Sequence, residues 1–152
     1  MNDPESPYTV GARFAALFGR FEFALKRGGF LSNKNVAQAD WTKFARWLGQ
    51  DFFDHVVKSN LATNLLNDPP RKLMRDGLTW MPRKPAPLRD VEELFVQGVC
   101  RVRNSYMHGE KFVGGPDANQ WERDVQLVRD ALAVLSEAED REPRVSAILR
   151  QR

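Results

Sequence analysis

The chain has 152 residues, of which 42% are hydrophobic, and its 23 basic and 20 acidic residues give a net charge of +3. This size and composition predict one folded domain with a single core and exclude a largely disordered chain. A charge this small permits contact with nucleic acid without indicating it.

Three further features narrow the class of protein. Apolar runs are only a few residues long, so no membrane span is expected, and the polar start MNDPESPY lacks the pattern of a signal peptide. The single cysteine excludes an internal disulfide, and with two distant histidines no metal site is expected. A reducing cytoplasm is the expected compartment.

The first half of the chain is predicted to be helical. Residues 1–7 are expected to form a flexible arm. From residue 8 to residue 27, apolar side chains recur at steps of three and four, which predicts an amphipathic helix. Asp40 is the expected N-cap of a second long helix. A shorter helical stretch follows at LATNLL (61–66), and a turn is expected over 71–76.

The second half begins with a predicted loop at 77–87, GLTWMPRKPAP, because it carries three prolines and a glycine. An apolar stripe at helical spacing then runs over 88–106, and another long helix is expected to start near residue 118 or 121. A tail helix is expected within 142–152. Since no useful stretch alternates with period two, we predict a single all-α domain over 1–152, a four-to-five-helix bundle.

Candidate chemistry lies at the end of the 88–106 stripe, in CRVRNSYMHGE. On an ideal helix, residues four apart share a face, so Asn104 and His108 would stack, with Arg101 one turn earlier. Arg103 would meet His108 only if the helix loosens at Gly109, or if two copies of the chain contribute to one cleft. Both residues lie off the apolar stripe and are expected to reach solvent.

These residue types suit acid–base chemistry on a phosphodiester without a metal ion, and the family resemblance given below implies RNA as the substrate. The imidazole of His108 can act as a base or an acid near neutral pH. The guanidinium of Arg103 can hold phosphate oxygens as negative charge builds, and Asn104 can orient the imidazole or bind phosphate. With RNA as the substrate, the products would be a 2′,3′-cyclic phosphate and a 5′-hydroxyl. The alternative that His108 only caps the helix C-terminus stays open.

The segment VRNSYMHGEKF resembles the signature of HEPN domains, the higher-eukaryote and prokaryote nucleotide-binding family. That signature is an Arg, often followed by Asn, and a His after four to six residues; here four residues separate Arg103 from His108. GRFEFALKR is loosely similar as well, with Glu22 as a structural polar residue among aromatics. Glu110 stands where toxins of one subgroup carry a tyrosine, so an antitoxin that modifies this tyrosine is not expected.

The resemblance implies a HEPN-like bundle that forms a homodimer and acts as an endoribonuclease, as a toxin or in phage defence. Arg103, His108 and Asn104 would be catalytic, and Arg101, Tyr106 and Lys111 would contact RNA. Tyr106 could instead pack in the core, and Lys111 could be a solvated loop residue. RNA is the expected substrate, no cofactor is expected, and the sequence identifies no antitoxin partner.

Some polar and aromatic residues are predicted to play no catalytic part. His55 is interpreted as structural, and Glu122 and Asp124 as favourable to a helix dipole. Trp80 could stack on RNA bases, although packing over the end of the bundle is the stronger interpretation. Two other functions remain open: a non-catalytic HEPN-like module that binds RNA or a nucleotide, and a plain helical adaptor.

Overall fold

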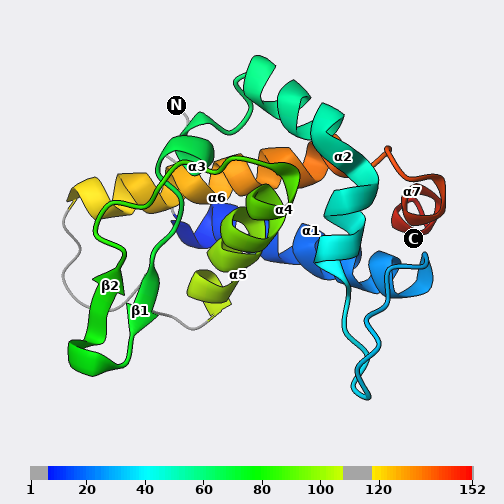
Figure 1. Ribbon diagram of the computed structural model, residues 1–152, viewed down its shortest axis with the longest axis horizontal. Helices are drawn as coiled ribbons and strands as arrows, with labels where there is room; N and C mark the ends of the chain where they lie inside the picture. The colour runs from blue at the N-terminus through cyan, green and yellow to red at the C-terminus, as the bar shows by residue number, and fades with distance from the viewer. Residues whose placement is uncertain (1–6, 108–117, 152) are drawn as a thin grey trace.

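The computed structural model describes residues 7–107 and 118–151. They form a mostly helical domain, which confirms the mainly helical prediction (Figure 1). The helices are α1 (Pro7–Arg27), α2 (Trp41–Lys58), α3 (Thr63–Asn67), α4 (Val91–Glu93), α5 (Cys100–Met107), α6 (Ala118–Ala138) and α7 (Pro143–Leu149), with a π-helical turn (Leu94–Val99) that joins α4 to α5.

One hydrophobic core holds these helices together. Helix α1 lies along α6 and also contacts α7, while α2 packs on α4 and the π turn (Figure 1). At the centre, Phe95 of the π turn is fully buried. Its ring lies 6.0 Å from that of Trp41 and 5.9 Å from those of Phe44 and Phe52, centroid to centroid. The aromatic side chains therefore connect α2 directly to the helix that leads into the CRVRNSYM segment.

The predicted N-cap of α2 is confirmed. The side chain of Asp40 accepts a hydrogen bond from the backbone N–H of Lys43, at 3.0 Å. We expect Asp40→Ala to lower the free energy of unfolding by about 1 kcal/mol, because one N–H at the helix start loses its acceptor. Asp40→Asn, which keeps an acceptor, should stay close to the wild type. Urea unfolding followed by circular dichroism measures both, and equal losses in the two variants would contradict this role.

A β-hairpin is the main departure from the prediction. Strands β1 (Lys72–Met74) and β2 (Thr79–Met81) pair antiparallel, with Leu73 opposite Trp80, through a 3₁₀ turn at Asp76–Leu78. The prediction of a turn over 71–76 and a loop over all of 77–87 is therefore wrong in part, and the fold is not purely α. Three-residue strands are too short to show a period of two, and Gly77, at φ +73°, supplies the tight turn.

The predicted ends of the domain need small corrections. Pro7 begins α1, so it does not belong to an arm, and residues 1–6 lie outside the described part of the chain. The tail helix is confirmed as α7, whose N-cap Glu142 accepts from the N–H of Val145 at 2.8 Å, but residues 150–151 lie beyond it. Within the described residues, no helix has the length and apolar character needed to cross a membrane.

The π turn changes which way α5 faces. The backbone N–H of Cys100 bonds to the carbonyl of Phe95, five residues back, instead of four. The turn thus contains one extra residue, so the side chains of α5 are rotated about the helix axis by about 100° relative to an uninterrupted α-helix. In this orientation Arg103 of α5 faces α1, which positions it for the contacts described next.

Candidate functional site

Arg103 lies against α1 and remains accessible to solvent. Its Nη2 is 3.8 Å from Oε1 of Glu22, and its guanidinium carbon is 5.4 Å from the centre of the Phe18 ring. The side chain is 38% exposed, as predicted for a residue off the core. The carboxylate and the ring hold one side of the guanidinium, which leaves its remaining donors able to meet an anion.

Asn104 connects Arg103 to a neighbouring groove. Its Oδ1 accepts a hydrogen bond from Nη1 of Arg103 at 3.3 Å, and the same side chain lines the groove. Arg101 lines that groove too. Nη1 of Arg101 also donates to the carbonyl of Pro70 at 3.5 Å. The structure thus brings Arg101, Arg103, Asn104 and Glu22 into one neighbourhood.

Cys100 lies beneath this neighbourhood with an unreactive thiol. Burial raises the pKa of Cys100 to about 12, with a further upward contribution from the negative charge of Glu22 and a downward one from Arg103. The thiol is therefore protonated at neutral pH and cannot act as a nucleophile there. Its pKa also reports on the charges of Glu22 and Arg103.

Alkylation of Cys100 should be slow in the folded protein. At pH 8 we expect iodoacetamide to react on the order of a thousandfold more slowly than with the urea-unfolded chain, because so little thiolate is present. Glu22→Gln should speed the reaction and Arg103→Ala should slow it, since each removes one charge that acts on the thiol. Mass spectrometry over time measures the rates, and a native rate equal to the unfolded one would contradict the burial.

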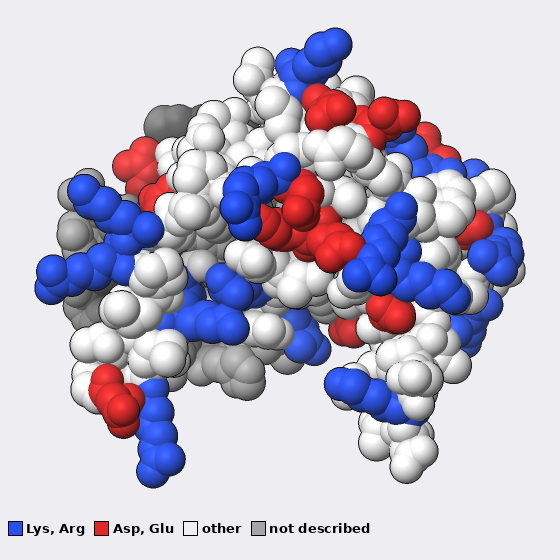
Figure 2. Space-filling view, in the orientation of Figure 1, with Lys and Arg blue, Asp and Glu red and all other residues white. Residues whose placement is uncertain are grey.

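A groove of about 700 Å³ separates the hairpin from α5. We call it the hairpin groove. Its wall includes Arg71, Lys72, Trp80, Arg101 and Asn104. None of its described lining residues is acidic. Figure 2 shows basic side chains gathered where the hairpin meets α5. Sequence reasoning missed Arg71 and Lys72, because only the hairpin brings them near Arg101; the basic pair beside a turn was the available signal.

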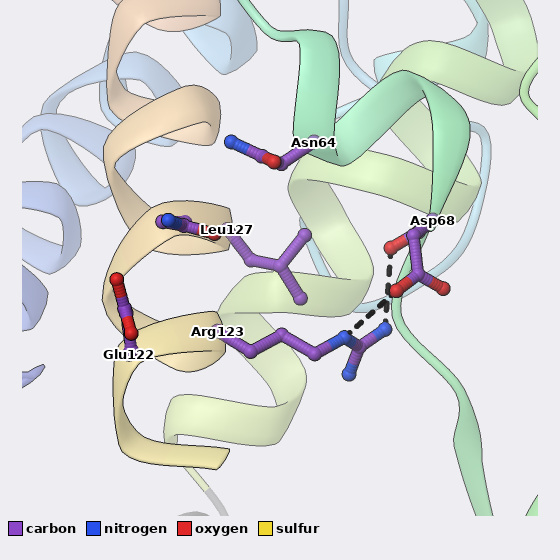
Figure 3. A pocket seen from close by; sticks show the side chains of 6 residues that line it. Asn64, Asp68, Glu122, Arg123 and Leu127 are labelled. Atoms are coloured by element: carbon purple, nitrogen blue, oxygen red, sulfur yellow. Dashed lines mark hydrogen bonds and ion pairs between the residues drawn. The ribbon is translucent and has the colours of Figure 1, made fainter. Parts of the chain in front are cut away.

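The hairpin is fastened to the helices at its start. Arg123 of α6 reaches the linker after α3, where its Nε lies 3.0 Å from Oδ2 of Asp68 and its Nη2 donates to the carbonyl of Asp68 (Figure 3). Nη2 also donates to the carbonyl of Pro69, at 3.5 Å. These bonds occupy Arg123 within a smaller pocket of about 350 Å³, between α3 and α6. Arg123 therefore positions the hairpin and is not a free cation for a ligand.

Several predicted site residues cannot be placed. His108, Gly109, Glu110 and Lys111 lie outside the described residues, and so does the side chain of Tyr106. Whether His108 meets Arg103, or caps the helix, stays a prediction. Trp80, in contrast, is half-buried in the wall of the hairpin groove, outside the described core cluster.

The positions and contacts of the remaining polar residues indicate structural roles. Nε2 of His55 on α2 lies 2.6 Å from Oε1 of Glu137 on α6, in agreement with its structural interpretation. This bond, with Arg141 assisting, holds the pKa of Glu137 below its usual value. Asp124 is buried near the start of α6 and Glu122 is exposed. The described residues include no group of three or more His, Cys, Asp or Glu side chains arranged to hold a metal ion.

Comparisons with protein-family models, with curated proteins and with solved structures find no match to this chain.

Proposed function

We propose that the protein is a HEPN-like endoribonuclease that cleaves RNA without a metal ion. In this proposal it acts as a homodimer in the cytoplasm, as a toxin or a phage-defence effector. Arg103, Asn104 and His108 carry the chemistry, and Glu22 holds Arg103 in place. No antitoxin partner is assigned.

One observation carries the proposal: a half-exposed Arg103, held by Glu22 and Asn104, stands beside a groove whose described wall carries three basic residues and no acidic one. An arginine that served only the stability of the fold would not need a groove with basic residues beside it. The Arg–Asn pair five and four residues before a histidine, and the mostly helical fold, agree with the same function.

The chemistry follows from the groups involved. The imidazole of one His108 takes the proton of the ribose 2′-hydroxyl, and the 2′-oxygen forms a bond to phosphorus. Arg103 donates to the phosphate oxygens as their negative charge grows. The bond from phosphorus to the 5′-oxygen then breaks, and the imidazolium of the partner copy protonates that oxygen. The products are a 2′,3′-cyclic phosphate and a 5′-hydroxyl.

Incubation of the purified protein with total RNA or tRNA, followed by mapping of the cleaved ends, tests the function. Cyclic phosphate and 5′-hydroxyl ends support the proposal. RNA binding without cuts selects the non-catalytic binding module instead. Neither cleavage nor binding selects the helical adaptor.

EDTA is expected to leave the cleavage rate unchanged, because the acid, the base and the phosphate clamp are all side chains. The measurement is the initial rate on one RNA, with and without the chelator. A metal-dependent ribonuclease assayed beside it serves as the control and should stop. Loss of cleavage that Mg²⁺ restores would contradict the proposed chemistry.

A further inference from the structure

The hairpin groove brings three basic side chains together without a described acidic partner. Arg71 and Lys72 come from the start of the hairpin, and Arg101 comes from α5. Among the described residues, Nε of Arg71 is buried without a hydrogen-bond partner. Like charges so gathered repel one another, so an anion in the groove is favoured.

Trp80 gives the groove an aromatic wall. Its strand pairs with β1 so that Trp80 stands opposite Leu73, and both side chains are half-buried and line the groove. An indole beside cations is the combination that proteins use for single-stranded nucleic acid, in which bases stack and phosphates meet basic side chains. A duplex keeps its bases stacked on each other and offers none to a recessed ring.

The groove is continuous with the Arg103 neighbourhood. Asn104 and Cys100 line the groove, Asn104 accepts from Arg103, and Cys100 feels the charges of both Glu22 and Arg103. A strand held in the groove would therefore have a phosphate within reach of Arg103. This continuity favours an RNA strand over an acidic protein segment, because RNA has phosphates that Arg103 can hold and an acidic segment has none.

We propose that the hairpin groove is the RNA-binding channel, in which three cations hold the backbone and one unpaired base stacks on Trp80. This inference rests on the proposed function and names its substrate class as single-stranded RNA. The hairpin is then the substrate-binding element, fastened at its start by Arg123.

Binding to a fluorescent single-stranded RNA of about ten nucleotides tests the proposal. All variants carry Arg103→Ala, so that cleavage does not consume the probe. Adding Trp80→Ala should weaken binding about tenfold, while Trp80→Phe, which keeps a ring, should retain most of the affinity. Trp47→Ala is the matched control, because Trp47 is 48% exposed on α2 and does not line the groove; it should leave binding unchanged.

The salt dependence of binding tests the cations separately. Lys72→Gln should weaken binding and make the slope of log affinity against log salt shallower by about 0.7, the loss of one phosphate contact. Lys58→Gln, on the exposed end of α2, should change neither. Circular dichroism spectra and melting temperatures confirm that each variant is folded.

The outcomes separate this inference from the proposed function. Unchanged affinity in both folded Trp80→Ala and Lys72→Gln overturns the channel, even if the wild type cleaves RNA. Equal affinity for duplex RNA, or for a polyglutamate peptide, overturns the single-strand assignment. Groove-dependent binding by a wild-type protein that never cleaves RNA overturns the enzyme and leaves the channel standing.

Discussion

Arg103→Ala is expected to lower the rate of RNA cleavage by about a hundredfold to a thousandfold, in a protein that stays folded. The loss follows because the guanidinium donates to phosphate oxygens whose charge grows in the transition state. Folding should survive because the side chain is 38% exposed and its contacts with Glu22, Asn104 and the Phe18 ring are each weak. Initial rates on one RNA measure the effect. His108→Ala should cause a similar loss, since no other imidazole lies nearby in the sequence.

Arg141→Ala is the matched control for this experiment. Arg141 has the same 38% exposure, forms an ion pair with Glu137, and lies 5.4 Å over the ring of Phe52, as Arg103 does over Phe18. It differs in that its hydrogen bonds go to Glu137 and it does not line the hairpin groove, so its loss should leave cleavage unchanged. Arg103→Lys should rescue little, because one ammonium cannot reproduce the paired donors. Undiminished cleavage by a clean Arg103→Ala preparation would remove the catalytic assignment.

Glu22→Gln separates positioning from catalysis. Glu22 touches Arg103 and no substrate atom in the proposed mechanism, so its loss should lower kcat by less than Arg103→Ala and leave KM nearly unchanged. The alkylation rate of Cys100 should rise in the same variant, because the pKa of the thiol falls. A purely structural Glu22 would change the melting temperature without this pattern.

Phe95→Ala should lower the free energy of unfolding by about 3–5 kcal/mol. Its ring is fully buried and contacts three other aromatic rings, so the variant loses those contacts and leaves a cavity. The midpoint of urea unfolding measures the loss. If the variant does not fold, Phe95→Leu should fold and show a smaller loss.

The same substitution at Phe23 provides the control. Phe23 is 50% exposed, and Arg27 lies over its ring. Its loss removes one surface cation–π contact and should cost about 0.5–1 kcal/mol. Equal costs at the two positions would show that the aromatic centre of the core is not where the structure places it.

The helices could be predicted because their apolar positions are dense and regular. Phe14, Phe21 and Phe44 fall on the expected stripes and are fully buried, and Asp40 caps as expected. The hairpin could not be predicted, because each strand has three residues and its position depends on Arg123 and Arg101 from distant helices. Local pattern carries no information on such long-range contacts.

The residues of the candidate site likewise include some that the sequence singled out and some that it did not. Arg103 and Asn104 stood out from their spacing, and the resemblance singled out Glu22, which the structure places 3.8 Å from Arg103. Arg71 and Lys72 did not stand out, because about thirty residues separate them from Arg101. The apolar spacing places Arg103 off the core, in agreement with its exposure, but a count at 3.6 residues per turn takes no account of the π turn that directs it toward α1.

The π turn between Leu94 and Val99 also relates the length of the chain to the direction of Arg103. Because it winds one residue more than an α-helix needs, a protein shorter by one residue there could form an uninterrupted helix and still aim the same arginine at the same glutamate. Straightening the turn at its present length would instead swing the arginine away by about a quarter of a rotation. The one extra residue in the π turn therefore determines that the guanidinium of Arg103 points toward Glu22.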